Sequence, residues 1–490
     1  MAQDNAFYQE PFRPQFHFSP PCGWMNDPNG MVYYQGEYHL FYQYNPKDIV
    51  WGPMHWGHAV SPDLVHWQNL PIALYPDDIG TMFSGSVVVD ADNTSGLVPG
   101  GGLIAIFSYN IQAQGIAYSR DKGRTWTKYE GNPVIGALAK DFRDPKVFWY
   151  EPSKHWVMVI AAGLHLQIFT SPNLINWEMT SQLSGGLAGG VWEVPDLFPL
   201  PFEGQTKWVL LGSVSQMAPA GGGGVRYFIG DFDGETFTYN ESDPAFWVDY
   251  GPDNYAGTTW SDMPIDKRTY IGWMSNWQYA ANTPTERWRG ATTLPREFRL
   301  IRTEEGIRLA QGPVESLTQL RESLGTWDNL NVNGDLVLDV VQGRTLEIIA
   351  DIQPETAERF GIDVQRGTDD SKTRILYNTK QSKLYISRPD KTEAGSINAF
   401  TSAFGAPIVL NNAPLRLHIF VDESSVEVFA QDGLFSLSSL TFVNPANKGV
   451  ALFAEKGTVK VSHLEVYALK GIWSTENINA EALNNFDFCS

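Results

Sequence analysis

The sequence predicts an all-β protein, in which a β-propeller is followed by a β-sandwich, and three observations support this fold class. The 490 residues include 45 glycines, 30 prolines and 17 tryptophans, a composition rich in turns and flat apolar side chains. A turn motif recurs at a nearly constant spacing through the first part of the chain. After residue 300 this repeat stops, and short strand-like segments separated by turn residues continue to Val466.

The repeated motif consists of turn residues followed by an aromatic residue. It occurs at Ser61–Trp67, Ser119–Trp126 and Ser171–Trp177, with a weaker copy at Gly230–Phe237. The first three copies start 119 − 61 = 58 and 171 − 119 = 52 residues apart. Such a period is typical of four-stranded propeller blades, and about 300 residues would hold five blades or six. We interpret each copy as a hairpin whose closing aromatic packs between sheets; a large β-sandwich with similar turns is the alternative.

Beyond the repeats, Pro313–Arg321 has the best helical pattern of the chain and is interpreted as a connector. Segments such as Leu415–Val421 then alternate partly between apolar and polar residues, as half-buried strands do. We therefore expect a propeller over residues 1–305, a linker with a short helix over 306–325, and a β-sandwich with a C-terminal tail over 326–490.

Charge excludes two classes of partner. With 35 basic and 55 acidic residues the formal net charge is −20, which disfavours nucleic acid and anionic membrane surfaces. No apolar run reaches the roughly 18 residues that a membrane-spanning helix needs. Nothing in the sequence predicts an oligomeric state.

The chain has few features of a secretory or metal-binding protein. Met1–Asn5 lacks both the basic and the apolar region of a leader, so we expect either a cytoplasmic protein or a leader replaced by Met1. Two cysteines, Cys22 and Cys489, are too few for a zinc cluster. We expect Cys22 to be a free thiol, with a Cys22–Cys489 bridge as the alternative. Gly221–Gly224 lacks the Lys-Ser/Thr of a phosphate-binding loop, and neither a cofactor nor a metal is predicted.

Three carboxylates, Asp27, Asp144 and Glu193, are the candidate catalytic residues. They are 144 − 27 = 117 and 193 − 144 = 49 residues apart, which places them on three different blades. The inner strands of a propeller converge at its axis, so the three acids are expected to face one pocket. Acids buried together repel each other, and this separates their pKa values into acid and base roles.

Each of these acids lies close to a proline. Proline cannot donate to a strand ladder, so it is expected where a strand ends or at a sheet edge. The residue before proline is held extended, which should restrict the directions of Asp27 and Asp144. Alternatively, Asp27 belongs to a simple hairpin turn and Arg143–Asp144 is an internal ion pair.

Five ordered motifs carry a resemblance to glycoside hydrolase family 32, which contains invertases, inulinases, levanases and fructan transferases. They are Trp24–Gly30, Gln43–Pro46, Phe83–Ser86, Phe142–Pro145 and Trp192–Asp196, and the similarity continues through Tyr255–Trp260, Gly272–Trp277, Trp288–Gly290 and Phe420–Phe429. The resemblance implies a five-bladed propeller followed by a β-sandwich.

The resemblance also implies residue roles. Asp27 would be the nucleophile, Glu193 the general acid/base, and Asp144 the residue that stabilises the transition state, as in a retaining glycosidase with a covalent intermediate. Trp192 and Val194 are expected to give Glu193 an apolar setting. The positions that would line the fructose pocket are Asn26, Gln43, Trp51, Phe83, Ser84, Arg143 and Trp273.

The resulting hypothesis is a secreted enzyme that releases terminal β-fructosyl units from levan, inulin or sucrose. The segment Trp51–Ser61 is more similar to levanases and exo-inulinases than to plant vacuolar invertases. One alternative is a levan fructotransferase, in which a hydroxyl of the substrate displaces Asp27 and yields a difructose anhydride. A more remote alternative is a carbohydrate-binding propeller without catalysis.

Val194 departs from the family pattern, because many members carry cysteine after the acid/base glutamate. We predict that Val194→Cys shifts the pH optimum measurably, since a polarisable thiol changes the local environment of Glu193. The pH–rate profiles of the two proteins test this prediction. Superimposable profiles would contradict it.

Overall fold

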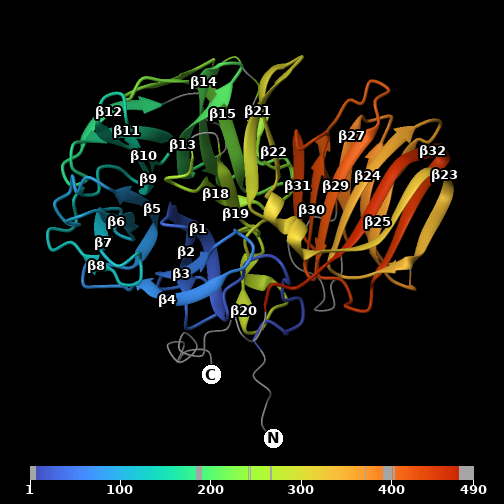
Figure 1. The fold of residues 1–490 in the computed structure, drawn as a ribbon, viewed down its shortest axis with the longest axis horizontal. Coiled ribbons are helices and arrows are strands. Elements are labelled where there is room, and N and C mark those ends of the chain that lie inside the picture. The colour runs from blue at the N-terminus through green and yellow to red at the C-terminus, as the bar shows by residue number, and fades with distance from the viewer. Residues whose placement is uncertain are drawn as a thin grey trace, which may run out of the picture.

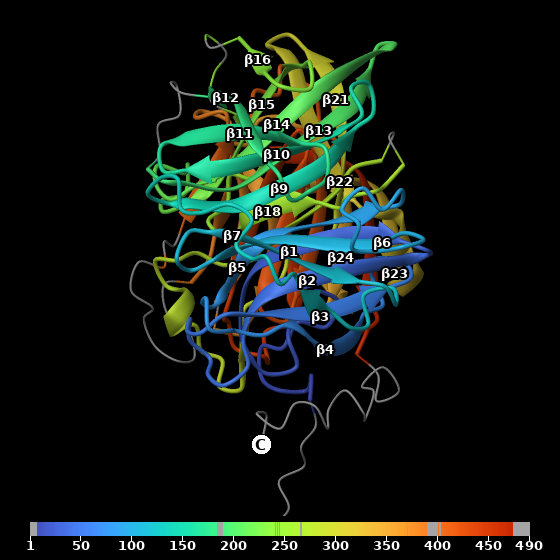
Figure 2. The ribbon, with the colours of Figure 1, turned by 90° about the vertical axis from the view of Figure 1, so that its left-hand side faces the viewer.

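Five β-sheets surround a common axis, and a β-sandwich packs beside the fifth sheet (Figure 1). A computed structural model describes residues 7–473 apart from 184–189, 241, 243, 245, 265–266, 370, 390–399 and 401–402. The expected C-terminal tail and Cys489 lie outside the described residues. Turned by 90°, the molecule shows sheets of the propeller in front of the sandwich (Figure 2).

Each propeller blade is an antiparallel sheet of consecutive strands, ordered from the axis outward. Blade 1 contains β1 (Gly23–Tyr34), β2 (Glu37–Asn45), β3 (His55–Ser61) and β4 (Gln68–Leu74), with β20 (Trp288–Arg289) parallel to β1. Blade 2 contains β5 (Met82–Asp90), β6 (Gly102–Tyr109), β7 (Gln114–Ser119) and β8 (Thr127–Lys128). Blade 3 contains β9 (Phe142–Tyr150), β10 (His155–Ala162), β11 (His165–Ser171) and β12 (Glu178–Leu183).

The last two blades are less regular. Blade 4 contains β13 (Trp192–Phe202), β14 (Gln205–Val214), β15 (Gly224–Phe232) and β16 (Phe237–Tyr239), and β17 (Phe246–Trp247) also pairs with β15. Blade 5 contains β18 (Tyr255–Thr259), β19 (Thr269–Trp273), β21 (Arg296–Thr303) and β22 (Gly306–Pro313), and the 3-10 helix η1 (Ala280–Asn282) lies between β19 and β20. The five-blade arrangement confirms the predicted fold class, and the six-blade and single-sandwich alternatives are wrong.

Within blade 5, β22 extends the propeller into the range that the sequence assigned to a linker. A second 3-10 helix, η2 (Glu315–Leu320), follows β22 and leads into the sandwich. None of the helices among the described residues is long and apolar enough to cross a membrane.

The sandwich is one hydrogen-bonded sheet that folds over on itself. Its strands are β23 (Arg321–Gln342), β24 (Leu346–Pro354), β25 (Arg359–Arg366), β26 (Thr373–Asn378), β27 (Lys383–Ser387), β28 (Ala403–Pro407), β29 (Leu415–Asp422), β30 (Ser425–Ala430), β31 (Phe435–Leu440) and β32 (Gly449–Leu469). The first part of β32 pairs with β25 and the second part with β24, so the long β23–β32 ribbon belongs to both layers. Apolar side chains from both layers form a single core between them.

The repeated motif is the turn between the third and fourth strands of a blade. Asp63 Oδ1 accepts hydrogen bonds from the backbone N of Val65 (3.0 Å) and His66 (2.8 Å), and Asn173 does the same for the two corresponding residues of blade 3. The short acceptor side chain replaces backbone partners in the turn, which explains why the motif recurs. The closing Trp126 packs edge-on against Phe41 of blade 1 (5.5 Å between ring centroids), which confirms that these aromatics lie between sheets.

The expectation that Cys22 is a free thiol is wrong. Its sulfur belongs to a disulfide, so it is not a free thiol. It lies 3.7 Å from the Tyr44 hydroxyl group, directly before β1.

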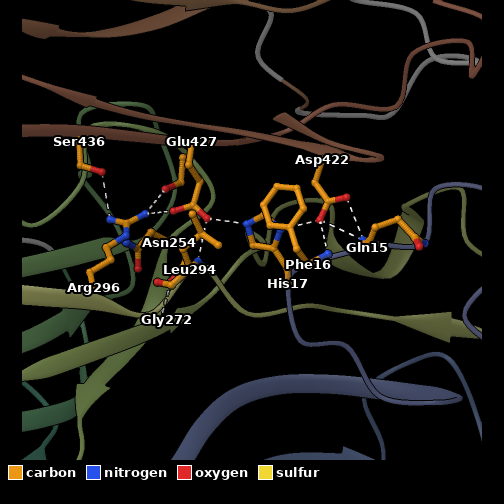
Figure 3. A network of polar contacts seen from close by, with 12 residues as sticks. Gln15, Phe16, His17, Asn254, Gly272, Leu294, Arg296, Asp422, Glu427 and Ser436 are labelled. Atoms are coloured by element: carbon orange, nitrogen blue, oxygen red, sulfur yellow. Dashed lines mark hydrogen bonds and ion pairs between the residues drawn. The ribbon is translucent and has the colours of Figure 1, made fainter. Parts of the chain in front are cut away.

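A buried ionic network joins the propeller to the sandwich (Figure 3). His17 places its Nδ1 2.7 Å from Asp422 and its Nε2 2.8 Å from Glu427, so both ring nitrogens contact carboxylates. Arg296 of β21 pairs with the other oxygen of Glu427 and lies 3.0 Å from Asp249. All of these side chains are at most 1% exposed, and buried charges persist in proteins only where partners of this kind compensate them.

The network predicts a pH-dependent stability. Burial alone lowers the pKa of His17, but the hydrogen bonds that its ring nitrogens donate to Asp422 and Glu427 outweigh it and raise the pKa to about 9. Because this folded-state pKa lies above the unfolded value, the stabilisation is complete below about pH 6.5 and is lost as the pH rises through 9. We predict that His17→Gln lowers the free energy of unfolding by about 3–5 kcal/mol at pH 6, and by much less at pH 10.

Thermal unfolding of both proteins between pH 6 and pH 10 measures this difference. His463→Gln is the matched control, since His463 pairs with Asp328 at an exposed site and should change stability little. A His17 effect that is constant over the whole pH range would contradict the prediction.

Candidate active site

The inner strands of all five blades are interrupted at the same level. Register shifts lie between Met25 and Pro28 in β1, Met82 and Gly85 in β5, Arg143 and Lys146 in β9, Glu193 and Asp196 in β13, and Tyr255 and Thr258 in β18. A bulge bends the strand and redirects the side chains beside it. Here the bulges direct one group from each blade, namely Asp27, Ser84, Asp144, Glu193 and Tyr255, toward the axis.

Prolines occupy three of these bulges. Pro145 and Pro195 lie in edge strands, and Pro28 lies in β1 beyond the two residues that pair with β20, so their missing N–H leaves few ladder bonds unmade. The expectation that proline holds Asp144 extended is wrong: its φ is 67°, in the left-handed region. Val194, before Pro195, has φ 46° and donates its backbone N–H to Asp144 Oδ2 at 3.0 Å. That bond links blades 3 and 4 at the axis.

A cavity of about 360 Å³ opens where the inner strands begin. Its lining consists of Asn26, Asp27, Gln43, Trp51, Phe83, Ser84, Arg143, Asp144, Glu193 and Trp277. Nine of the ten residues selected from the sequence are therefore brought together. Asp27 lies within β1, so its interpretation as part of a simple hairpin turn is wrong.

Trp273 is the one selected residue that does not line the cavity. It is completely buried, and its ring lies behind that of Trp277, with 4.8 Å between centroids. Trp277 also stacks on Trp24 at 5.9 Å, so two buried indoles hold the ring that reaches the cavity. Both tryptophans belong to one sequence motif, and only the path of the turn after β19 decides which of them is at the surface.

Two donors fix the carboxylate of Asp27. Asn26 Nδ2 donates to Oδ1 at 3.0 Å, and Ser84 Oγ from blade 2 donates to Oδ2 at 2.7 Å. The amide of Asn26 is in turn held by the indole N–H of Trp24 at 2.8 Å. Burial raises the pKa of Asp27 to about 6, while the hydrogen bonds from Asn26 and Ser84 oppose the rise. Near neutral pH the group is thus an oriented carboxylate.

Glu193 has a different set of partners. Arg143 Nη2 donates to Oε1 at 3.0 Å, and the Tyr255 hydroxyl group donates to Oε2. The expected apolar setting is therefore wrong for the carboxyl group, although Val194 itself packs in an apolar cluster with Trp273. Burial and the charge of Glu193 hold the pKa of Tyr255 well above its usual value, so the phenol stays a proton donor in this hydrogen bond.

The sequence interpretation missed Tyr255 as a site residue. It starts the inner strand of blade 5, 255 − 193 = 62 residues after Glu193, close to the spacing of the repeated motif. Extending the blade period by one more unit would have indicated it.

Asp144 is the third carboxyl group. Burial raises its pKa to about 7, and the guanidinium group of Arg143 opposes this rise. Three acids with different hydrogen-bond partners can divide nucleophilic and acid/base work between them. Within the described residues, no group of three or more His, Cys, Asp or Glu side chains is arranged to hold a metal ion.

Comparisons with known proteins agree with this geometry. The model of the glycosyl hydrolases family 32 N-terminal domain matches residues 17–313, and that of the family 32 C-terminal domain matches residues 314–468. A levanase of Bacillus subtilis (strain 168) is 49% identical, over 97% of this chain and 73% of the levanase. An extracellular exo-inulinase of Aspergillus niger is 37% identical, over 95% of this chain and 96% of its own.

A solved structure shows the same fold. The crystal structure of an exo-inulinase from Aspergillus awamori superposes with a TM-score of 0.90 at 34% identity, and covers 95% of this chain and all of its own. The two family models together span nearly the whole described chain, and the levanase is well above 30% identical to it. The chain is therefore a member of glycoside hydrolase family 32.

Proposed function

We propose that this glycoside hydrolase is a retaining β-fructofuranosidase that releases terminal fructosyl units from levan, inulin and sucrose. One observation carries the proposal: Asp27 and Glu193 reach one cavity from separate blades, and each has its own hydrogen-bond donors. The cavity volume is at the lower end of the range for small-ligand sites, which suits one terminal sugar better than an internal segment of a chain. The levanase and exo-inulinase names of the relatives support the substrate class.

The proposed reaction has two steps. In the first, the carboxylate of Asp27 bonds to the anomeric carbon while Glu193 gives its proton to the departing glycosidic oxygen. In the second, Glu193 takes a proton from water, whose oxygen displaces Asp27 and yields fructose. In this proposal Asp144 and Arg143 hold fructosyl hydroxyl groups, and the phenol of Tyr255 orients Glu193 through both steps.

The relatives also favour hydrolysis over transfer. Both the levanase and the exo-inulinase are named for the breakdown of fructans. We further propose that the protein acts outside the cell, as the word extracellular in the name of the Aspergillus niger relative suggests.

Product identification tests the proposal directly. Incubation with levan, inulin and sucrose should release free fructose, and Asp27→Ala and Glu193→Ala should each lower kcat by about 10³-fold or more. Asp231→Ala is the matched control, since this exposed carboxylate pairs with Lys207 far from the cavity and should leave turnover unchanged. A difructose anhydride as the product would instead indicate the transferase, and the absence of turnover would indicate a sugar-binding propeller.

The donors to Asp27 predict a pH effect. Protonation of Asp27 removes the nucleophile, so kcat/KM should fall as the pH drops through about 6. Ser84→Ala removes a hydrogen bond that stabilises the carboxylate, which raises the pKa of Asp27 and moves this acid limb to higher pH. The pH dependence of kcat/KM measures the shift, and Ser86→Ala is the control because Ser86 accepts from Val147 N and does not contact Asp27. An acid limb that moves to lower pH in Ser84→Ala would contradict the assignment.

A further inference from the structure

Large apolar side chains gather on one end of the propeller. Among the described residues twelve large hydrophobic side chains are exposed, and three of them belong to the sandwich. Of the remaining 12 − 3 = 9, only Met179 lies in a strand, and the other eight lie in loops. Six of these eight residues lie in the loops β2–β3 (Trp51), β6–β7 (Ile111), β8–β9 (Leu138), β10–β11 (Leu164), β14–β15 (Met217) and β19–β20 (Trp277).

Strand order places all of these loops at the same end of the propeller. The strands of each blade are antiparallel, so the turn between its second and third strands lies at the end where its inner strand begins, and so does the connection from the preceding blade. That end is also where the cavity opens. In the part of the chain that the structure describes, the turns at the opposite end carry none of the exposed large hydrophobic residues.

Hydrogen bonds attach these loops to the catalytic groups. Beside Ile111, Gln112 Oε1 accepts from Arg143 Nη1 at 3.4 Å. Beside Leu164, Gly163 donates its backbone N–H to the carbonyl of Asp141, whose side chain pairs with Arg143 at 2.8 Å. The β6–β7 and β10–β11 loops therefore border the cavity.

We call Ile111, Leu138, Leu164 and Met217 the apolar rim. They are 52%, 60%, 60% and 70% exposed, and they come from loops of blades 2, 3 and 4 and from the connection between blades 2 and 3. Exposed apolar side chains that gather on one face mark an interaction site, whereas isolated ones are ordinary.

The rim is continuous with the cavity. Trp51 and Trp277 line the cavity and are still 49% and 46% exposed, so each has one part toward the bound sugar and another toward solvent. A further contact joins the loop of Trp277 to a loop of the rim: Asn276 Nδ2, next to Trp277, donates to the carbonyl of Gly221 in the β14–β15 loop that carries Met217. A chain that leaves the cavity past Trp277 would meet the loop that carries Met217.

We propose that the apolar rim binds the sugar units of a fructan chain beyond the terminal unit in the cavity, and so favours polymer over sucrose. The inference rests on the proposed function. The C–H faces of sugar rings are apolar and can cover these side chains, and a neutral polymer avoids the repulsion that a net charge of −20 imposes on anionic partners. Sucrose has only one sugar unit besides the fructosyl unit in the cavity, so it is too short to cover the rim.

The test compares two substrates and two variants of the full chain. The rim variant combines Ile111→Ser, Leu138→Ser, Leu164→Ser and Met217→Ser, and the matched control combines Met179→Ser and Val409→Ser, which are equally exposed but lie elsewhere. In the rim variant kcat/KM for long-chain levan should fall about tenfold, chiefly through KM, because each lost contact covers apolar area. Turnover of sucrose should change less than about twofold, which also shows that the variant is folded. Equal losses on both substrates, no loss on levan, or the same loss in the control would overturn the inference.

A second measurement needs no turnover. Affinity electrophoresis in gels that contain levan should retard the wild-type protein and the control but not the rim variant. If the wild type releases no fructose from any substrate, the proposed function fails, while selective retardation still supports the rim and equal migration overturns it. Sedimentation that shows a wild-type dimer and a monomeric rim variant would also overturn it, because the rim would then bind a second copy.

Discussion

The guanidinium group of Arg143 holds together carboxyl groups that would otherwise repel one another. It pairs with Asp141 at 2.8 Å and with Glu193 at 3.0 Å, and it lies 3.9 Å from Asp144. Although burial opposes it, the charges of Asp144 and Glu193 raise the pKa of Arg143 above its usual value. A buried acid without such a partner becomes protonated, so this one cation allows three carboxyl groups to share a cavity.

Backbone geometry brings those groups to one place. Five inner strands carry their bulges at the same level, and each bulge aims one polar group at the axis. The sandwich supports this arrangement from the side of blade 5. Glu427 pairs with Arg296 and accepts a hydrogen bond from the backbone N of Leu294, at the end of the segment that contains Trp277 (Figure 3). The ionic network therefore fixes the base of a loop whose tip forms part of the cavity.

Much of the fold could be predicted from the sequence, because the turns that repeat in it have a local cause. An acceptor such as Asp63 satisfies the backbone of its own turn, and this chemistry is readable without a structure. The separation of Asp27, Asp144 and Glu193 onto three blades followed from the same period. The strand bounds at the propeller–sandwich junction were less readable, since β22 and η2 lack a repeated signature.

The remaining differences arise from details that spacing does not encode. Asp144 takes a left-handed φ because the bulge, not the proline alone, decides its conformation. The polar surroundings of Glu193 come from Arg143 and Tyr255 on other blades, whereas its sequence neighbours Trp192 and Val194 pack in apolar clusters. The choice between Trp273 and Trp277 depends on the path of a loop. Each of these features is set by contacts between blades.

In the proposed mechanism, Asp27 forms a covalent bond to the fructosyl unit while Glu193 acts first as an acid and then as a base. Mass spectrometry of Glu193→Ala after incubation with β-fructofuranosyl fluoride tests it most directly, since fluoride leaves without an acid and the missing base slows release of the sugar. We expect an adduct of one fructosyl unit, mapped by peptide analysis to Asp27. An adduct on another residue, or an unmodified protein that still consumes the fluoride, would contradict it.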